Sequence, residues 1–263
     1  MEILCTNDDG ILSPGLAAAV EVAREFATVS IVAPSTQKTG AGRSLMGDRK
    51  APLSATEIQL STGPAQAYQL DGTPAFVVRH ALATVLRSRT FDLAISGINY
   101  GENMAYDIGT SATVGAAMES AVKGIPGIAI SVQTELDGHR TYGRLDWSAT
   151  QFFLRQFIRR FVEKRGFSGF DVLKIDVPMT ASPDTPWKLC RLFRGPYYGA
   201  RMKKVSDDSV FADNELYIDT TPFAPGTDAH VLAVEKKVAV VPLVLDWTAS
   251  ETGGFFTHEP PRQ

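Results

Sequence analysis

Short apolar segments alternate with helical segments through the first 180 residues, and this alternation leaves few folds open to the chain. An apolar run at 3–6 leads through a turn to a helical face over 15–26, and a second apolar run follows at 29–33. A strand, a helix and another strand in this order build a parallel sheet. The same pattern predicts further helices at 75–87, 113–123 and 147–165, and further strands at 91–95, 128–132 and 172–177.

The composition changes after Pro178. Residues 179–230 are rich in Pro, Gly, Asp and aromatic side chains, with a strand-like piece at 215–219, and 231–245 contains strand-forming runs. We therefore predict an α/β fold with a three-layer Rossmann-like core and a mostly parallel sheet over residues 1–180. Residues 181–263 should form a smaller β-rich C-terminal extension that is used in oligomerisation.

Charge and composition argue against several classes of protein. With 26 Lys and Arg against 29 Asp and Glu the formal charge is −3, whereas a protein that binds nucleic acid duplexes usually presents a basic face. Neither Cys5 nor Cys190 belongs to a metal-spaced cluster. No segment resembles a signal peptide, and no apolar run approaches the roughly 20 residues of a membrane helix. We expect a cytoplasmic protein that acts neither on a membrane nor on a nucleic acid duplex.

Polar side chains follow three of the predicted strands, at the edge of an open α/β sheet where ligands bind. Adjacent carboxylates repel each other, and a bound cation would offset that cost. Carboxylate, amide and hydroxyl oxygens favour a hard cation such as Mg²⁺ or Mn²⁺. An Asp-Gly turn beside a helix start is the alternative interpretation of the first loop. The three loops contain Asn7, Asp8, Asp9 and Gly10 after the first strand, Thr39 and Gly40 after the second, and Asn99 and Asn103 after the strand at 91–95.

A fourth segment suits an anion. Ser111 and Thr113 lie where the predicted helix at 113–123 begins. Free backbone N–H groups at a helix start can bind phosphate, and the hydroxyls can add donors. The alternative is an ordinary N-cap.

Together these segments resemble the SurE (survival protein E) family of metal-dependent nucleotidases. Weaker similarities, including Asp71–Ala75 and Gly226–Asp228, extend the resemblance over nearly the whole chain in the same order. The segments that carry the resemblance are Thr6-Asn7-Asp8-Asp9-Gly10-Ile11, Val32-Ala33-Pro34 with Gln37-Lys38-Thr39-Gly40, Ser96-Gly97-Ile98-Asn99-Tyr100-Gly101-Glu102-Asn103, and Ser111-Ala112-Thr113-Val114-Gly115.

The resemblance implies hydrolysis of nucleoside 5′-monophosphates to nucleoside and phosphate, with one divalent cation (Mg²⁺ or Mn²⁺) per subunit. It also implies a homodimer or homotetramer that exchanges C-terminal elements. By position, the family's site residues fall on Asp8, Asp9, Thr39 and Asn99 as metal ligands, on Asp8, Asp9 and Asn99 as catalytic residues, and on Asn7, Gly40, Asn103, Ser111 and Thr113 as substrate-binding residues.

Three positions depart from the usual family pattern. Thr39 stands in place of a serine and Ala112 in place of a glycine. The usual Asn-x-Asn-x-Pro reads Lys-Ile-Asp-Val-Pro over 174–178, and no role is transferred to it.

Other enzyme classes fit the sequence less well. A nicotinamide-dependent dehydrogenase needs G-x-G-x-x-G after the first strand, where this chain has two aspartates. A haloacid dehalogenase-type phosphatase needs Asp-x-Asp, whereas Asp8 and Asp9 are adjacent. The remaining alternative is a catalytically weak nucleotide-binding or assembly module that retains the site.

The sequence also leaves open whether water or an aspartate attacks phosphorus, and which group protonates the leaving alcohol.

Overall fold

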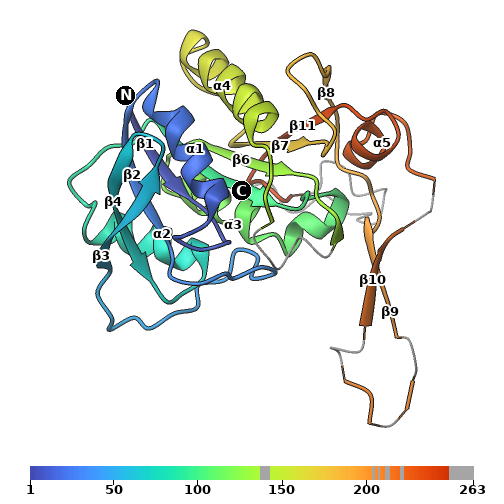
Figure 1. Cartoon of the computed structure of the whole chain (residues 1–263), viewed down its shortest axis with the longest axis horizontal. Helices are drawn as coiled ribbons and strands as arrows, with labels where there is room; N and C mark the ends of the chain where they lie inside the picture. Colours follow the sequence, from blue (N-terminus) through green and yellow to red (C-terminus); the bar gives the residue numbers. More distant parts are fainter. Residues whose placement is uncertain (137–142, 203–204, 207, 211–213, 220–221, 249–263) are drawn as a thin grey trace, which may run out of the picture.

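The computed structural model describes residues 1–136, 143–202, 205–206, 208–210, 214–219 and 222–248. Its main feature is a nine-stranded sheet with helices on both faces (Figure 1), in the order β3-β4-β2-β1-β5-β6-β7-β11-β8. These strands are β1 (Glu2–Thr6), β2 (Thr28–Pro34), β3 (Ser54–Leu60), β4 (Gly63–Leu70), β5 (Leu93–Tyr100), β6 (Gly127–Val132), β7 (Val172–Val177), β8 (Trp187–Leu189) and β11 (Val238–Leu243).

The centre of the sheet is parallel, from β4 through β2, β1, β5 and β6 to β7. In β1, Cys5 lies opposite Ile31 of β2 and Ile95 of β5. All three side chains are buried, because helices cover both faces of a sheet of this kind and its strands are therefore apolar throughout. The predicted α/β fold with a mostly parallel sheet is confirmed.

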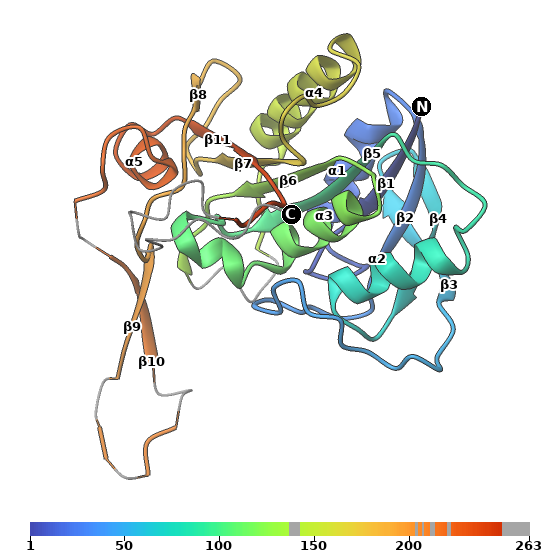
Figure 2. The same ribbon diagram turned by 180° about the vertical axis from the view of Figure 1, so that it is seen from behind.

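Five helices cover the two faces. On one face α1 (Pro14–Arg24) lies beside α4 (Ser148–Glu163), and their buried side chains belong to one core cluster. On the other face lie α2 (Pro74–Ala83), α3 (Ala112–Val122) and α5 (Asp228–Ala233), and Figure 2 shows α2 and α3 from that side. The predicted helices are present, with ends shifted by one to four residues.

Helix α1 begins as the sequence predicts. The Ser13 hydroxyl accepts a hydrogen bond from the Gly15 N–H, and Pro14 occupies the first helical position. Gly15 also permits a close approach to β5, because a Cβ at this position would lie 2.1 Å from the Ile98 carbonyl oxygen. This contact places the start of α1 against the strand that carries Asn99.

The residues after Pro178 divide between two places. β8 and β11 join the main sheet, where β11 pairs antiparallel with β7. β9 (Tyr198–Met202) and β10 (Asn214–Ile218) form a separate antiparallel pair, which we call the arm (Figure 1). The expected extension is therefore only partly separate from the core.

Three segments differ from the sequence-based expectation. Val231 lies in α5, where Thr227 provides the N-cap, so only 238–243 of the run at 231–245 is a strand. The antiparallel pair β3–β4 was not predicted at all. Strand β5 does not end at Ile95 but continues through Asn99, with a register shift against β6 between Ser96 and Asn99.

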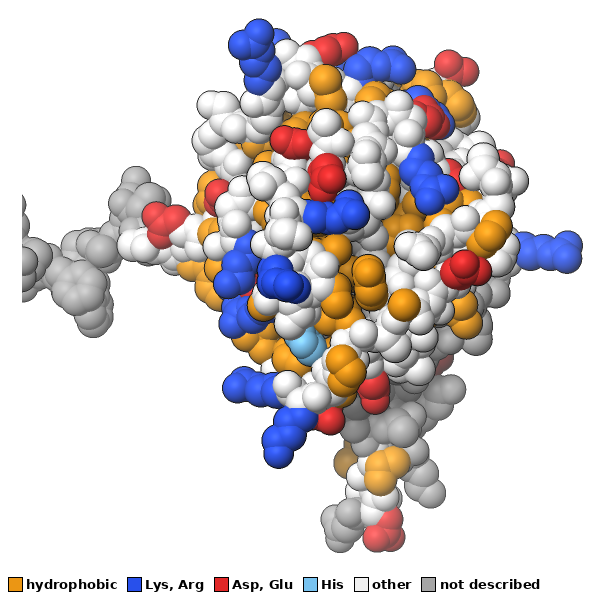
Figure 3. Space-filling view, turned by 90° about the vertical axis from the view of Figure 1, so that its left-hand side faces the viewer, with side chains coloured by type: hydrophobic (Ala, Val, Ile, Leu, Met, Phe, Trp, Pro, Cys, Tyr) orange, Lys and Arg blue, Asp and Glu red, His pale blue; other side chains and the backbone are white. Residues whose placement is uncertain are grey.

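The surface has mixed charge. On the face shown in Figure 3, Lys and Arg side chains are interspersed with Asp, Glu and hydrophobic side chains. Of the helices in the part of the chain that the structure describes, none is long and apolar enough to cross a membrane.

Candidate active site

The predicted site residues gather at the carboxyl edge of β1, β2 and β5. β1 lies between the other two strands, and the chain leaves it through α1 towards β2 and later returns on the opposite side as β5. Such a reversal of strand order opens a crevice at the carboxyl ends of the strands. A cavity of about 260 Å³ lies there, and its wall includes six of the predicted residues: Asp8, Thr39, Gly40, Asn99, Asn103 and Ser111.

Asp8 and Asp9 are held in place before any ligand arrives. Both are buried, at 3% and 1% exposure. Asp8 Oδ1 accepts a hydrogen bond of 2.5 Å from the Thr113 hydroxyl. Asp9 Oδ1 accepts one of 3.0 Å from Gln37 Nε2, and Asp9 Oδ2 accepts one of 3.3 Å from the Tyr100 N–H. The two carboxylates therefore have fixed orientations.

Burial makes the charge of this pair costly. Burial raises the pKa of Asp8 to about 6, although the hydrogen bond from Thr113 acts to lower it. Burial, and then the negative charge of Asp8, raises the pKa of Asp9 to about 8. Among the described residues Asp8 forms no ion pair. Two neighbouring buried carboxylates of this kind fit a hard divalent cation, which would offset both the burial and the repulsion.

Thr39 and Asn99 can supply further oxygen ligands. The loop that contains Thr39 is joined to β1 by a 2.7 Å hydrogen bond from the Lys38 N–H to the Asp8 carbonyl oxygen. Asn99 Nδ2 donates to the Gly101 carbonyl oxygen at 2.6 Å, so its amide oxygen is the atom that could bind a cation. The described residues contain no group of three or more His, Cys, Asp or Glu side chains arranged for a metal. The candidate ligand set is thus two carboxylates and neutral oxygens.

The start of α3 forms another part of the cavity wall. Ser111 is its N-cap, with a hydroxyl that accepts from the Val114 N–H at 3.1 Å. Ala112, where the family usually has glycine, is the first helical residue and is not among the residues with positive φ. Alanine therefore fits this position without backbone strain. The Thr113 hydroxyl is directed at Asp8 and does not line the cavity.

Asn7 and Asn103 have other partners. The Asn7 side chain lies outside the cavity wall, where Nδ2 donates to the Gly10 carbonyl oxygen at 3.0 Å and Oδ1 accepts from the Gly10 N–H at 3.2 Å. This pair closes the turn after β1, in which Gly10 has φ of +102°. Asn103 lines the cavity, and its Nδ2 donates to the Ser131 hydroxyl at 2.7 Å.

A buried ionic cluster behind the cavity was not predicted. Lys174 Nζ binds the Asp176 carboxylate and lies 3.2 Å from Asp228 Oδ2, and all three side chains are at most 1% exposed. Lys174 also donates to the Asn103 carbonyl oxygen, and Asp176 accepts from the Asn103 N–H, each at 2.7 Å. Asp228 accepts from the Ala105 N–H at 2.9 Å. The cluster fixes the backbone over 103–105, and its signals in the sequence were the charged residues Lys174 and Asp176 within an otherwise apolar strand and the family similarity at Gly226–Asp228.

The sequence analysis also missed part of the cavity wall. Met104 and Asp107 follow Asn103, whereas Tyr198 and Leu216 come from the arm. No motif marked the arm residues, because they reach the site only through the tertiary fold.

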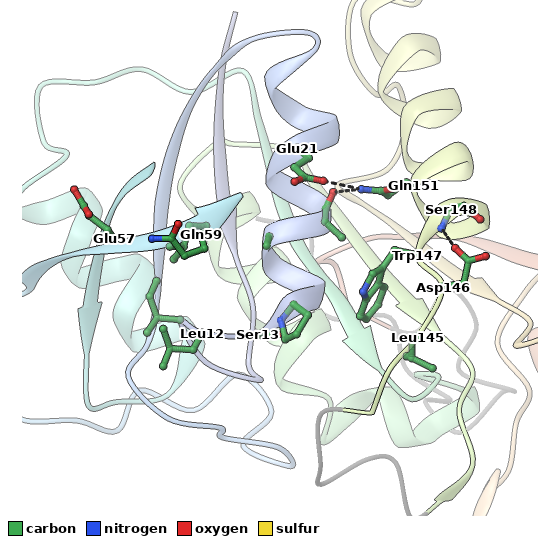
Figure 4. A pocket seen from close by; sticks show the side chains of 15 residues that line it. Leu12, Ser13, Glu21, Glu57, Gln59, Leu145, Asp146, Trp147, Ser148 and Gln151 are labelled. Atoms are coloured by element: carbon green, nitrogen blue, oxygen red, sulfur yellow. Dashed lines mark hydrogen bonds between the residues drawn. The ribbon is translucent and has the colours of Figure 1, made fainter. Parts of the chain in front are cut away.

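A larger cavity of about 680 Å³ lies outside this site, between β3, the start of α1 and the residues before α4 (Figure 4). Gln151 there binds Glu21, and Ser148 binds Asp146. The Trp147 ring packs edge-on against Tyr100, with centroids 5.0 Å apart. Asp8, Asp9 and Asn99 are not in its wall, so the smaller cavity is the better candidate for chemistry.

Comparison with known proteins shows which family the chain belongs to. The family model described as survival protein SurE matches residues 3–198. A 5′-nucleotidase SurE from Thermococcus gammatolerans is 40% identical over 255 residues, covering 95% of this chain and 92% of the relative. The 5′-nucleotidase SurE from Thermococcus kodakarensis is 39% identical over 252 residues, covering 95% and 94%. The crystal structure of the SurE protein from Aquifex aeolicus superposes with a TM-score of 0.73 at 28% identity, over 94% of this chain and 95% of that one.

Proposed function

The chain belongs to the SurE family, and from this premise we propose that it is a 5′-nucleotidase that acts in the cavity at the ends of β1, β2 and β5. It hydrolyses nucleoside 5′-monophosphates to nucleoside and phosphate, and it uses a divalent cation. The finer assignment is one Mg²⁺ or Mn²⁺ per subunit, held by Asp8, Asp9, Thr39 and Asn99.

The observation that carries this proposal is the pair of adjacent buried carboxylates, of which Asp8 lines the cavity and Asp9 lies behind its wall. A purely structural Asp-Gly turn would gain nothing from placing two charged side chains at 3% and 1% exposure, since burying an uncompensated charge is costly. When bound, a divalent cation would offset these charges and stabilise the negative charge that develops on the transferred phosphate.

The protein's own groups orient the reactants. The hydrogen bonds from Thr113, Gln37 and the Tyr100 N–H hold the two carboxylates in place. The start of α3 at Ser111 borders the same cavity, and the positive end of its dipole favours a phosphate group there. A phosphate placed between these elements would be oriented before attack, which lowers the entropic part of the barrier.

The hydrogen bonds also favour water over Asp9 as the nucleophile. Both oxygens of Asp9 accept hydrogen bonds, and Asp8 Oδ1 accepts a short one from Thr113. A carboxylate oxygen engaged in this way is a weaker nucleophile, because its lone pairs are partly committed to donors. Attack on phosphorus by a water molecule leaves these contacts intact.

The direct test is phosphate release from a nucleoside monophosphate by the purified protein. EDTA should abolish the activity, and Mn²⁺ or Mg²⁺ should restore it, because the two carboxylates need a cation to accommodate a phosphate dianion. Full activity after exhaustive chelation would contradict the metal assignment. A nucleotide-binding module without catalysis, which the resemblance to 5′-nucleotidases does not favour, would bind the nucleotide and release no phosphate.

A further inference from the structure

The arm contributes to the wall of the active-site cavity. Tyr198 of β9 and Leu216 of β10 line it together with Met104. In the antiparallel register Tyr198 pairs with Ile218 and Ala200 with Leu216, so Tyr198 and Leu216 lie on the same face of the arm. Tyr217 lies on the opposite face, where the Arg201 guanidinium stacks on its ring. One face of the arm thus belongs to the site and the other does not.

The base of the arm is firmly joined to the loop that carries Asn103. The Tyr198 hydroxyl donates to the Glu102 carbonyl oxygen at 2.8 Å, and the Tyr197 hydroxyl donates to Glu102 Oε1 at 2.9 Å. Asp107 Oδ2 accepts from the backbone N–H groups of Tyr197 and Tyr198 at 2.9 and 3.0 Å. These four hydrogen bonds make the arm base and the loop one unit, so the apolar wall has a fixed position relative to Asn103.

The chemistry of this wall differs from that of the metal and phosphate region. Asp8, Thr39 and Asn99 offer oxygen ligands, whereas Tyr198 and Leu216 offer aromatic and apolar surface, with the buried Met104 packed behind them. Such a surface suits an uncharged ring system. Asp107 in the same wall carries a carboxylate, which would repel a second phosphate group. The cavity therefore suits a substrate with one phosphate and an uncharged heterocyclic part.

We propose that Tyr198 and Leu216 form the nucleoside side of the substrate site, with the nucleobase against the arm. The inference rests on the proposed function, because it assumes that the phosphate occupies the region of Asp8 and Ser111. It makes the arm a determinant of substrate specificity.

The test compares Leu216→Asp with Tyr217→Asp, a matched control one residue away on the other face. Both residues are exposed, at 44% and 37%. Each variant is assayed with a nucleoside monophosphate and with ribose 5-phosphate, which has the same kind of ester but no base. In Leu216→Asp the ratio of the two kcat/KM values should fall about tenfold, mainly through KM for the nucleotide, a typical effect of losing an apolar contact in a substrate pocket. In Tyr217→Asp the ratio should stay within about twofold of wild type.

Two results would overturn the inference: an equal loss for both substrates in Leu216→Asp, or no loss for either. If Leu216→Asp fails to fold, Leu216→Ala serves instead, with the same direction and a smaller change in the ratio. If the wild type releases no phosphate at all, the proposed function fails, and calorimetric titration with the nucleoside monophosphate and Mn²⁺ then decides the subsite. A Kd about tenfold weaker in the Leu216 variant only would support the subsite, and an equal Kd in both variants would refute it.

Discussion

Replacing Asp9 with asparagine should stabilise the metal-free protein while it destroys the metal site. Asp9 is 1% exposed beside Asp8, and the pKa of Asp9 is raised from 3.8 to about 8. One pKa unit corresponds to about 1.4 kcal/mol, so the ionised side chain costs the folded state on the order of 6 kcal/mol. Asparagine can accept only one of the two hydrogen bonds, from Gln37 or from the Tyr100 N–H. This mismatch destabilises the folded variant by about 1–3 kcal/mol and so reduces the gain. The net gain at pH 9 is on the order of 3 kcal/mol.

The sign of the pH dependence follows from the raised pKa. The folded state binds the Asp9 proton more tightly than the unfolded state, so the cost is absent below pH 3.8 and complete above about pH 8. The free energy of unfolding of the metal-free wild type should therefore fall as pH rises through this window. Asp9→Asn should show a smaller fall, because asparagine does not titrate.

Added metal should make wild type more stable than Asp9→Asn. Wild type gains stability by mass action when Mn²⁺ is present in excess of its Kd, by about 4 kcal/mol at a thousandfold excess. Asp9→Asn should gain little, and its turnover should fall by about a hundredfold or more because a charged ligand is missing. Urea unfolding at pH 5 and pH 9, with EDTA or with Mn²⁺, is run beside the phosphate assay. Asp184→Asn, at an exposed position, controls for the loss of a negative charge and should change stability by less than about 0.5 kcal/mol.

The reasoning would be refuted by an Asp9→Asn protein that is less stable than wild type without metal at pH 9 and is nearly fully active. That pattern would mean that Asp9 serves the turn after β1 and not a cation. A turn or cap interaction would cost on the order of 1 kcal/mol on removal.

Two further predictions concern the remaining ligand and the assembly. Thr39→Ser should keep or raise activity, because it retains the hydroxyl without the methyl group. Thr39→Val should lose activity in the phosphate assay. Equal activity of the valine variant and wild type would exclude the hydroxyl as a ligand. Light scattering should show at least a dimer, because the arm is a two-stranded element outside the main sheet and such a pair is marginal by itself. A monomer at micromolar concentration would contradict the expected use of residues 181–263 in oligomerisation.

The rule that ligands bind at the carboxyl ends of parallel strands was sufficient to bring the loops of Asp8, Thr39 and Asn99 together from the sequence. Each of these follows or ends an element whose apolar pattern is strong, so its place at the sheet edge could be inferred without knowing any long-range contact. The predicted core was correct for the same reason: β1, β2, β5, β6 and β7 are buried on both faces.

Features that depend on tertiary contacts could not be predicted. Tyr198 and Leu216 enter the cavity wall because Asp107 and Glu102 hold the arm there, and no periodicity encodes that contact. Asn7 is predicted to bind substrate, and nothing in the sequence indicated that its amide would also hydrogen-bond with Gly10. β3 and β4 alternate buried and exposed side chains only weakly, so their pairing gave little signal.

The hydrogen bond between Asp228 and Ala105 joins residues 123 positions apart and has a consequence for synthesis on the ribosome. Chains emerge N-terminus first at about 5–20 residues per second, so Asp228 follows Ala105 by roughly 6–25 s. Throughout that interval the nascent chain already contains Asp8, Asp9 and Asn99, but the backbone around Asn103 lacks part of its anchor. A ribosome that stalls before Asp228 therefore holds a chain in which Asp8, Asp9 and Asn99 are already made, while the Ala105 N–H still lacks its native partner.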